Sequence, residues 1–323
     1  MIDILIVHSR AKSHEKVANQ ICSYLRNEKI SYIVQKITDE PIRDIDFKLG
    51  LFVITFDRLS ISEIAKFFPH VKHKVLYVTV EGIPIIDRLT HNILEDVDLI
   101  IPNSEFTLDM INYVGYKTSV MPIYHEAKVT TPNVEKLREL KDWKGNDKVV
   151  LWVGMNQKRK GLDQLAKITR KVVEVRDDVK FLVLTGLGEV NLRALGFSMN
   201  TRIDLNIGSL SEEDLASYYN IADVVISTSY CEGFGMTINE ALAYGKKVLT
   251  PRYRPFTEYV TYTAKIRKIY YENYMNYMMF RMHVLDIDDF VDKLIDLLDN
   301  DYVTGTPKLN TYSKLIDYLR LFL

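Results

Sequence analysis

The sequence predicts an α/β protein with two domains, each built on a mostly parallel β-sheet covered by helices. Three observations predict this class. Short runs of β-branched and aliphatic residues are apolar at nearly every position, as in strands buried on both faces of a sheet. Longer stretches with helical spacing separate these runs, which indicates right-handed βαβ units. The alternation stops once, near the middle of the 323 residues, and then begins again.

The first series of strands and helices lies in residues 1–123, which we expect to form the N-terminal domain. It opens with an apolar run at Ile2–Val7, followed by helical spacing at Val17–Leu25. Five further runs predict strands at Tyr32–Ile37, Leu49–Thr55, Val75–Val80, Leu99–Ile101 and Ser119–Pro122.

The stretch 124–147 interrupts the alternation. It is mostly polar and charged, and it contains Pro132 and Gly145. Such a composition is typical of a loop, so we expect a linker between the domains that carries one short helix.

The second series lies in residues 148–308, which we expect to form the C-terminal domain. Strands are predicted at Val149–Val153, Val179–Thr185, Ile203–Ile207, Val224–Ser227 and Lys247–Thr250. Helices are predicted over about 162–176, 212–221 and 236–244. The final stretch, 309–323, has helical spacing again.

Composition excludes several classes of protein. Apolar residues make up 47% and charged residues 26%, which is ordinary for a folded chain and excludes a disordered, collagen-like or disulfide-rich protein. With a net charge of −1, the chain has no overall positive field for nucleic acid. No run of 18 apolar residues occurs, so we expect at most a peripheral membrane contact. Cys22 and Cys231 stand alone, so we expect no zinc site and a reducing, cytoplasmic setting.

Residues 253–282 are rich in tyrosine and methionine. Seven tyrosines lie between Tyr253 and Tyr277, and four methionines follow or interleave with them. Aromatic side chains of this kind can stack on a nucleobase or a sugar, or lie against a lipid. We favour the structural alternative, a half-buried helix or pair of strands that covers the second domain.

The segment 230–245 carries the clearest functional signal. It follows a predicted strand and reads YCEGFGMTINEALAYG. Gly233 and Gly235 permit tight turns and a close approach of backbone N–H groups to a ligand, and helical periodicity begins directly after them. A helix N-terminus after such a loop binds anions such as pyrophosphate. Glu232 lies in the loop, and Glu240 lies one to two turns into the helix.

This segment resembles the EX7E motif of retaining glycosyltransferases with the GT-B fold, in particular glycosyltransferase family 4. The stretch 152–163 is similar to the donor-phosphate loop of that family, and 98–106 to the end of its first domain. The resemblance covers roughly residues 75–260. It implies two Rossmann-like domains that face each other across a cleft, with the C-terminal helix 309–323 crossing back to the first domain.

The resemblance also implies the reaction. A hexose would move from a nucleoside-diphosphate sugar, a UDP- or GDP-sugar, to an acceptor hydroxyl, and the anomeric configuration would be retained. Neither a metal nor another cofactor is expected, because fixed cations and helix dipoles can stabilise the departing diphosphate. Carbohydrate, lipid and protein all remain possible acceptors.

Individual roles follow from the resemblance. Glu240 would bind the ribose hydroxyls, and Glu232 would act as a catalytic residue beside the donor sugar. Lys160 would neutralise the diphosphate, which gains negative charge as the glycosidic C–O bond breaks. The backbone amides that would contact the sugar hydroxyls or the phosphate belong to Gly233, Phe234, Gly235 and Met236.

Two positions depart from the pattern of the family. Met155 stands where the phosphate loop usually has an arginine. We expect Arg159 to supply this charge, because a guanidinium can hold phosphate with two hydrogen bonds, whereas Lys158 fits a solvated turn equally well. Glu81 stands where the first domain usually has a histidine, just before Gly82. It would orient the acceptor or accept its proton, which makes it the second catalytic candidate.

Other hypotheses remain open. A glycosidase is disfavoured, because residues eight apart on a helix lie ~12 Å apart, beyond the ~5–9.5 Å between the carboxylates of hydrolases. A nucleotide-sugar-binding protein with weak or no transferase activity is the main alternative, motivated by Met155 and Glu81. An epimerase or phosphorylase of the same fold is a third, although a phosphorylase would need a much longer chain. Three Asp-x-Asp triplets lack the supporting pattern of a metal site, and we expect them to be solvated.

Overall fold

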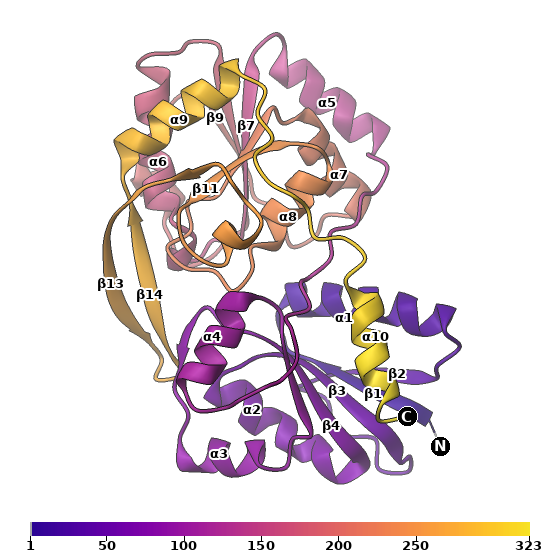
Figure 1. Ribbon diagram of the computed structural model, residues 1–323. Coiled ribbons are helices and arrows are strands. Elements are labelled where there is room, and N and C mark those ends of the chain that lie inside the picture. Colours follow the sequence, from indigo (N-terminus) through magenta and orange to yellow (C-terminus); the bar gives the residue numbers. More distant parts are fainter. Residues whose placement is uncertain (1) are drawn as a thin grey trace.

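Two parallel β-sheets form the framework of the protein, one in each half of the chain (Figure 1). The structure is a computed structural model that describes residues 2–323. The first sheet has the strand order β2-β1-β3-β4-β6, and the second has the order β12-β11-β10-β7-β8-β9. Neighbouring strands are parallel throughout both sheets. The predicted α/β class is therefore confirmed.

Residues 2–123, called the first half below, surround the first sheet. The strands are β1 (Ile2–His8), β2 (Tyr32–Lys36), β3 (Phe47–Thr55), β4 (Val71–Thr79) and β6 (Leu99–Pro102). The helices are α1 (Lys12–Asn27), α2 (Arg58–Ile64), α3 (Arg88–Leu94) and α4 (Glu105–Tyr113), with a 3-10 helix η1 (Ala65–His70). Strands β1 and β3 are buried along most of their length, because helices cover both faces of the sheet.

One predicted strand of the first half is wrong. Ser119–Pro122 forms an irregular segment after α4. Pro122 has no N–H to donate to a ladder, and Met121 is exposed rather than buried. The next backbone hydrogen bond to β6 comes from Ile123, whose N–H donates to the carbonyl of Pro102.

Residues 124–147 contain one helix, α5 (Val134–Lys144), where one short helix was predicted. The side chain of Asn133 caps this helix by accepting hydrogen bonds from the N–H groups of Glu135 and Lys136. The helix packs against the second half, because Leu140 is buried in the core of that half.

Residues 148–308, called the second half below, surround the second sheet. The strands are β7 (Lys148–Val153), β8 (Val179–Leu184), β9 (Thr201–Asp204), β10 (Val224–Ile226), β11 (Lys247–Pro251) and β12 (Thr263–Ala264). The helices are α6 (Leu162–Val173), α7 (Glu212–Ile221), α8 (Met236–Ala243) and α9 (Ile287–Asp299), with 3-10 helices η2 (Lys158–Lys160), η3 (Leu192–Leu195) and η4 (Phe256–Glu258). The strand predicted at Ile203–Ile207 ends earlier, at Asp204.

The last helix, α10 (Tyr312–Arg320), returns to the first half. It lies beside α1 in Figure 1, with the C-terminus near β1. Tyr312 and Leu315 are buried in the same core cluster as Val17 and Ala18 of α1. The expected return of the C-terminal helix is therefore present.

The tyrosine- and methionine-rich stretch includes an antiparallel hairpin, β13 (Ile266–Tyr274) and β14 (Met278–Leu285). The expected strand pair is present, but it does more than cover the second half. Strand β14 also pairs with β5 (Gly82–Pro84) of the first half, so the hairpin spans both halves (Figure 1). Phe280 and Met282 of β14 are buried in the core cluster of the first half, whereas β13 is largely exposed.

Candidate functional site

The predicted site residues gather where the two halves meet. The loop that carries Glu232 follows β10 and packs directly on the end of β4. A Cβ at Gly233 would overlap the hydroxyl oxygen of Thr79 and lie 2.5 Å from the carbonyl oxygen of Val80. Only a glycine fits this contact, so the sequence of the loop sets how closely the halves approach each other here.

Four charged side chains form a cluster across this junction. Lys160 Nζ lies 2.6 Å from Glu232 Oε1. The guanidinium of Arg159 lies between two carboxylates, 2.6 Å from Glu81 Oε1 and 3.5 Å from Glu232 Oε2. The hydroxyl of Ser229 donates a further hydrogen bond of 2.7 Å to Glu232. Two positive and two negative charges therefore balance each other in a largely buried place.

The two carboxylates of this cluster differ in pKa. Burial raises the pKa of Glu81, and the charges of Arg159 and Lys160 offset only part of this effect. Burial also acts on Glu232, but the same two cations and the hydrogen bond from Ser229 outweigh it, so its pKa lies below the ordinary value. Glu232 therefore remains ionised at a pH where Glu81 already begins to bind a proton. Pairs of carboxylates with separated pKa values are typical of active sites.

The three basic side chains of η2 have partners on two different sides. Arg159 and Lys160 point to Glu232, whereas Lys158 is exposed and forms a 2.8 Å ion pair with Glu272 on the hairpin. Met155 is also exposed. The structure thus places Arg159 beside Glu232 and turns Lys158 toward the hairpin.

Glu240 occupies a separate part of the junction. It lies on α8 with only 5% of its surface exposed. Tyr219 donates a 2.7 Å hydrogen bond to Glu240 Oε2, and Lys16 of the first half lies 2.8 Å from Oε1. Glu232 and Glu240 therefore have different partners, and they do not form a carboxylate pair around one centre.

Aromatic side chains fix the shape of the loop between these two glutamates. The buried ring of Phe234 contacts the rings of His125 and Tyr259, at centroid distances of 5.4 and 5.2 Å. Tyr259 donates hydrogen bonds to the carbonyls of Phe234 and Gly235. Gly235 has a φ of +87°, which favours glycine, and it precedes Met236, the first residue of α8. The buried packing of Phe234 thus helps to fix the conformation of the loop.

Three helices that begin near the junction have no side-chain cap: α1 at Ala11, α6 at Gly161 and α8 at Gly235. Helix α4, which also begins at the junction, is capped by Ser104, and α2, α3, α5, α7 and α9 are capped by a side chain as well. Helix α10 has no side-chain cap at Thr311. Free N–H groups at a helix N-terminus attract anions, so the uncapped helices suit a phosphate-bearing ligand.

Sequence reasoning missed several residues of the junction. Lys16 and Tyr219, which hold Glu240, were not among the predicted site residues and lie in the regular helices α1 and α7. Glu258 is another: its carboxylate accepts hydrogen bonds from the N–H groups of Glu105 and Phe106 and so caps α4 of the other half. The contacts of Lys16 and Glu258 join segments more than 150 positions apart, so no local signal marks them, whereas Tyr219 lies 21 positions before Glu240.

Residues 2–323 lack two further features. No group of three or more histidine, cysteine or acidic side chains has the arrangement of a metal site in this part of the chain. Likewise, none of the helices in this range is long and apolar enough to span a bilayer.

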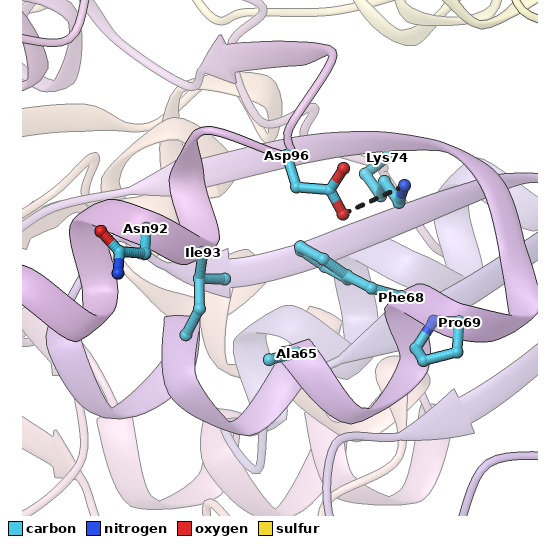
Figure 2. A pocket seen from close by; sticks show the side chains of 7 residues that line it. All are labelled: Ala65, Phe68, Pro69, Lys74, Asn92, Ile93 and Asp96. Atoms are coloured by element: carbon cyan, nitrogen blue, oxygen red, sulfur yellow. Dashed lines mark ion pairs between the residues drawn. The ribbon is translucent and has the colours of Figure 1, made fainter.

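A surface hollow of about 460 Å³ lies on the first half, away from the junction (Figure 2). It opens at the beginning of β4, whereas the junction is at the end of that strand. Its lining residues are Ala65, Phe68, Pro69, Lys74, Asn92, Ile93 and Asp96. Lys74 and Asp96 pair with each other at 3.2 Å. The two charges satisfy each other, and we assign the hollow no function.

Comparison with known proteins places the chain in a family. Residues 133–318 match the family described as glycosyl transferases group 1, which is more than half of the chain. An uncharacterized glycosyltransferase 335 of Sulfolobus islandicus rod-shaped virus 1 is 28% identical over 200 residues, 58% of each chain. The alpha-monoglucosyldiacylglycerol synthase of Streptococcus pneumoniae is 29% identical over 220 residues, 63% of this chain and 49% of that protein. The matches thus span about half of the curated relatives.

A solved structure shows the same fold. TarM of S. aureus, in complex with UDP and alpha-GlcNAc-glycerol, superposes with a TM-score of 0.60 at 16% identity and covers 95% of this chain and 58% of TarM. At this identity the likeness concerns the fold, and TarM is a neighbour of the GT-B type. The match over residues 133–318 shows that the chain belongs to the glycosyl transferases group 1 family.

Proposed function

We propose that this protein is a retaining glycosyltransferase of the family 4 type, which transfers a hexose from a UDP- or GDP-sugar to an acceptor hydroxyl without a metal ion. The observation that carries this proposal is the position of Arg159 and Lys160. Both cations face Glu232 beside the uncapped N-termini of α6 and α8. This arrangement suits a diphosphate, which becomes more negative as it leaves.

The donor would occupy the second half, residues 148–308, in this proposal. The carboxylate of Glu240 would accept hydrogen bonds from the ribose hydroxyls, which a buried carboxylate held in place by Tyr219 can do with both oxygens. The diphosphate would bind Arg159, Lys160 and the backbone amides from Gly233 to Met236. The binding of UDP by TarM supports a uridine donor as the first to test.

Arrival of the diphosphate would rearrange the charge cluster. Without a ligand, Glu81 and Glu232 neutralise Arg159 and Lys160. A bound diphosphate supplies the anionic partner for both cations, which releases Glu81 to accept a hydrogen bond from the acceptor hydroxyl. Glu81 thus becomes available only when the donor is present.

The chemical step then exchanges one C–O bond for another. The bond between the anomeric carbon and the diphosphate oxygen breaks, and its electron pair leaves with the diphosphate. The acceptor oxygen forms the new bond on the same face of the sugar, and its proton passes to the departing phosphate oxygen. Glu81 orients the acceptor, and Glu232 stays ionised beside the sugar, where it stabilises positive charge at the anomeric carbon.

The acceptor would approach from the first half, residues 1–123 with helix 309–323, and the linker 124–147 would join the halves. Carbohydrate, lipid and protein hydroxyls remain the acceptor classes in this proposal. A lipid is the first to test, because one relative is named an alpha-monoglucosyldiacylglycerol synthase.

A second candidate function is donor binding without transfer. The ion pair between Arg159 and Glu81 favours it. In this pair, the side chain expected to bind phosphate and the side chain expected to orient the acceptor neutralise each other. A protein of this kind would bind a nucleotide sugar tightly and release no nucleotide with any acceptor.

Calorimetric titration tests the proposal. UDP-glucose, UDP-galactose, UDP-N-acetylglucosamine, GDP-mannose, UDP and GDP would be titrated into the wild type with EDTA and, in parallel, with Mg²⁺. We expect at least one of them to bind, and Lys160→Ala to weaken it by ~1–3 kcal/mol, as for a lost charged hydrogen bond. Lys158→Ala is the matched control, since this lysine of the same triplet faces the hairpin.

Three results would speak against the proposal. Absence of binding by all six nucleotides would remove the donor site. An equal effect of the two lysine variants would show that Lys160 does not contact the diphosphate. Binding that EDTA abolishes would contradict the metal-independent mechanism.

A further inference from the structure

Lys16 reaches from the first half to the carboxylate that we assign to the ribose. Its Nζ lies 2.8 Å from Glu240 Oε1 and 3.0 Å from Glu212 Oε2. The side chain of Glu240 is 7% exposed and that of Lys16 is 22% exposed, whereas Glu212 is half exposed. The contact with Glu240 is therefore the shielded one, where an ion pair is stronger than in water.

The other oxygen of this carboxylate is held from within the second half. Tyr219 donates a 2.7 Å hydrogen bond to Glu240 Oε2, and its own ring is buried and stacks on Tyr244 at 5.1 Å. One carboxylate oxygen is thus bound by each half of the protein. A carboxylate oxygen has two acceptor positions, so each still has one for a ribose hydroxyl.

The two charged residues occupy corresponding places in their helices. Lys16 stands four residues after the first residue of α1, and Glu240 stands four residues after the first residue of α8. Their ion pair therefore joins the second turns of two helices that begin without a side-chain cap. Ligand binding at Glu240 is thereby linked to the position of α1.

We infer that Lys16 is a positioning residue of the donor site, which orients the carboxylate of Glu240 for the ribose diol from the opposite half of the protein. This inference rests on the proposed function, because it takes Glu240 as the ribose ligand. It assigns Lys16 no contact with the diphosphate and no part in the chemical step.

The inference predicts which part of nucleotide binding depends on Lys16. If Lys16 acts through Glu240, its loss should affect the part of the binding energy that comes from the ribose hydroxyls. A general loss of folding, or a direct contact between Lys16 and the phosphates, would weaken all nucleotides alike. A nucleotide and its 2′-deoxy analogue distinguish these cases.

The experiment compares UDP with 2′-deoxy-UDP, or GDP with 2′-deoxy-GDP if the guanine nucleotide is the one that binds. Calorimetry gives the two dissociation constants for the wild type and for Lys16→Met, Lys16→Arg and Lys12→Met. Lys12 is the matched control, because it lies on the same helix with its side chain 77% exposed. Thermal unfolding of each variant checks that it is folded.

We expect the wild type to prefer the ribonucleotide about tenfold, and Lys16→Met to reduce this preference to twofold or less. Lys16→Arg should restore most of the preference, and Lys12→Met should keep it. An unchanged preference in Lys16→Met overturns the inference, as does tighter ribonucleotide binding, which would make Lys16 a competitor of the ribose. If the wild type binds neither nucleotide, the proposed function fails, and the inference fails with it.

Discussion

Arg159 of the second half and Glu81 of the first half form an ion pair of 2.6 Å across the junction, and both side chains are mostly buried. The pair joins the expected phosphate-binding residue to the expected acceptor residue. A donor that binds Arg159 must therefore change the surroundings of Glu81. In the proposed function, donor binding and acceptor orientation would be linked through this one contact.

The first prediction concerns Glu81→Gln. Removal of the carboxylate frees Arg159 for the diphosphate, so we expect nucleotide affinity to stay the same or to rise. Turnover should fall about a hundredfold or more, because the acceptor loses the group that orients it. Calorimetry and release of the nucleoside diphosphate measure the two effects separately.

Asp109→Asn is the control for this prediction. Asp109 pairs with Arg254 across the same junction, but both side chains are about half exposed, and such pairs contribute little. Equal losses of turnover in Glu81→Gln and Asp109→Asn would mean that Glu81 only holds the halves together.

The second prediction concerns stability below neutral pH. Burial lowers the pKa of His283 to about 4, from 6.5 in the unfolded chain. Between these values the unfolded chain binds the extra proton, so stability falls as the pH falls through this window, by up to ~1.4 kcal/mol per pH unit. Burial likewise lowers the pKa of His14 to about 4 and that of His125 to about 3, which steepens the loss.

His283→Phe tests this dependence, because phenylalanine can keep the stacking on Tyr253, at 4.1 Å in the structure. Urea unfolding between pH 7 and pH 4 gives the slope for each protein. The variant should lose stability less steeply than the wild type as the pH falls. Parallel curves would show that His283 does not contribute to the acid sensitivity.

Local patterns predicted every strand of the first sheet, the strands of the second sheet except β12, and the tight loop before α8. β1 and β3 were recognisable because burial on both faces leaves nearly continuous apolar runs. Gly233 and Gly235 were recognisable because a tight loop before a helix needs glycine. Ser119–Pro122 looked like a strand because it is mostly apolar, but a proline without an N–H cannot continue a ladder.

These local patterns did not predict the contacts between the halves. Lys16 binds Glu240, 224 positions away, and nothing around Lys16 in the sequence distinguishes it from a solvated helical lysine. The hairpin was ambiguous for a related reason. Phe280 is buried by the core of the first half, so its environment depends on a segment about 200 residues away. Such features follow from how the halves meet.

The third prediction concerns Gly233→Ala. The added methyl group would collide with the backbone of Val80 and the side chain of Thr79. Relief requires the halves to move apart, so we expect a loss of ~1–3 kcal/mol in unfolding free energy, as for overpacking of a core. Nucleotide binding should weaken as well. Gly208→Ala is the control, because a Cβ at Gly208 meets no atom within 4 Å; equal urea unfolding curves for the two variants would contradict the prediction.

The last prediction concerns the hairpin that joins the halves. Phe280 is 6% exposed, stacks on Tyr274 at 4.9 Å and pairs with Gly82 of β5. Phe280→Ala leaves a cavity and should cost ~3–5 kcal/mol if the hairpin stays in place. A small three-stranded sheet can instead detach locally, which caps the measured loss at the free energy of detachment.

Hydrogen exchange of the amides in β5 and β14 separates these two outcomes, because only detachment accelerates exchange in both strands while the remaining core stays protected. Tyr271→Ala is the control, since this side chain on β13 is 57% exposed and its loss should cost no more than ~0.5 kcal/mol. Because β5 begins directly after Glu81, detachment should lower turnover more than nucleotide binding. Unchanged exchange of β5 in Phe280→Ala, together with unchanged turnover, would show that the hairpin has no influence on the acceptor side of the junction.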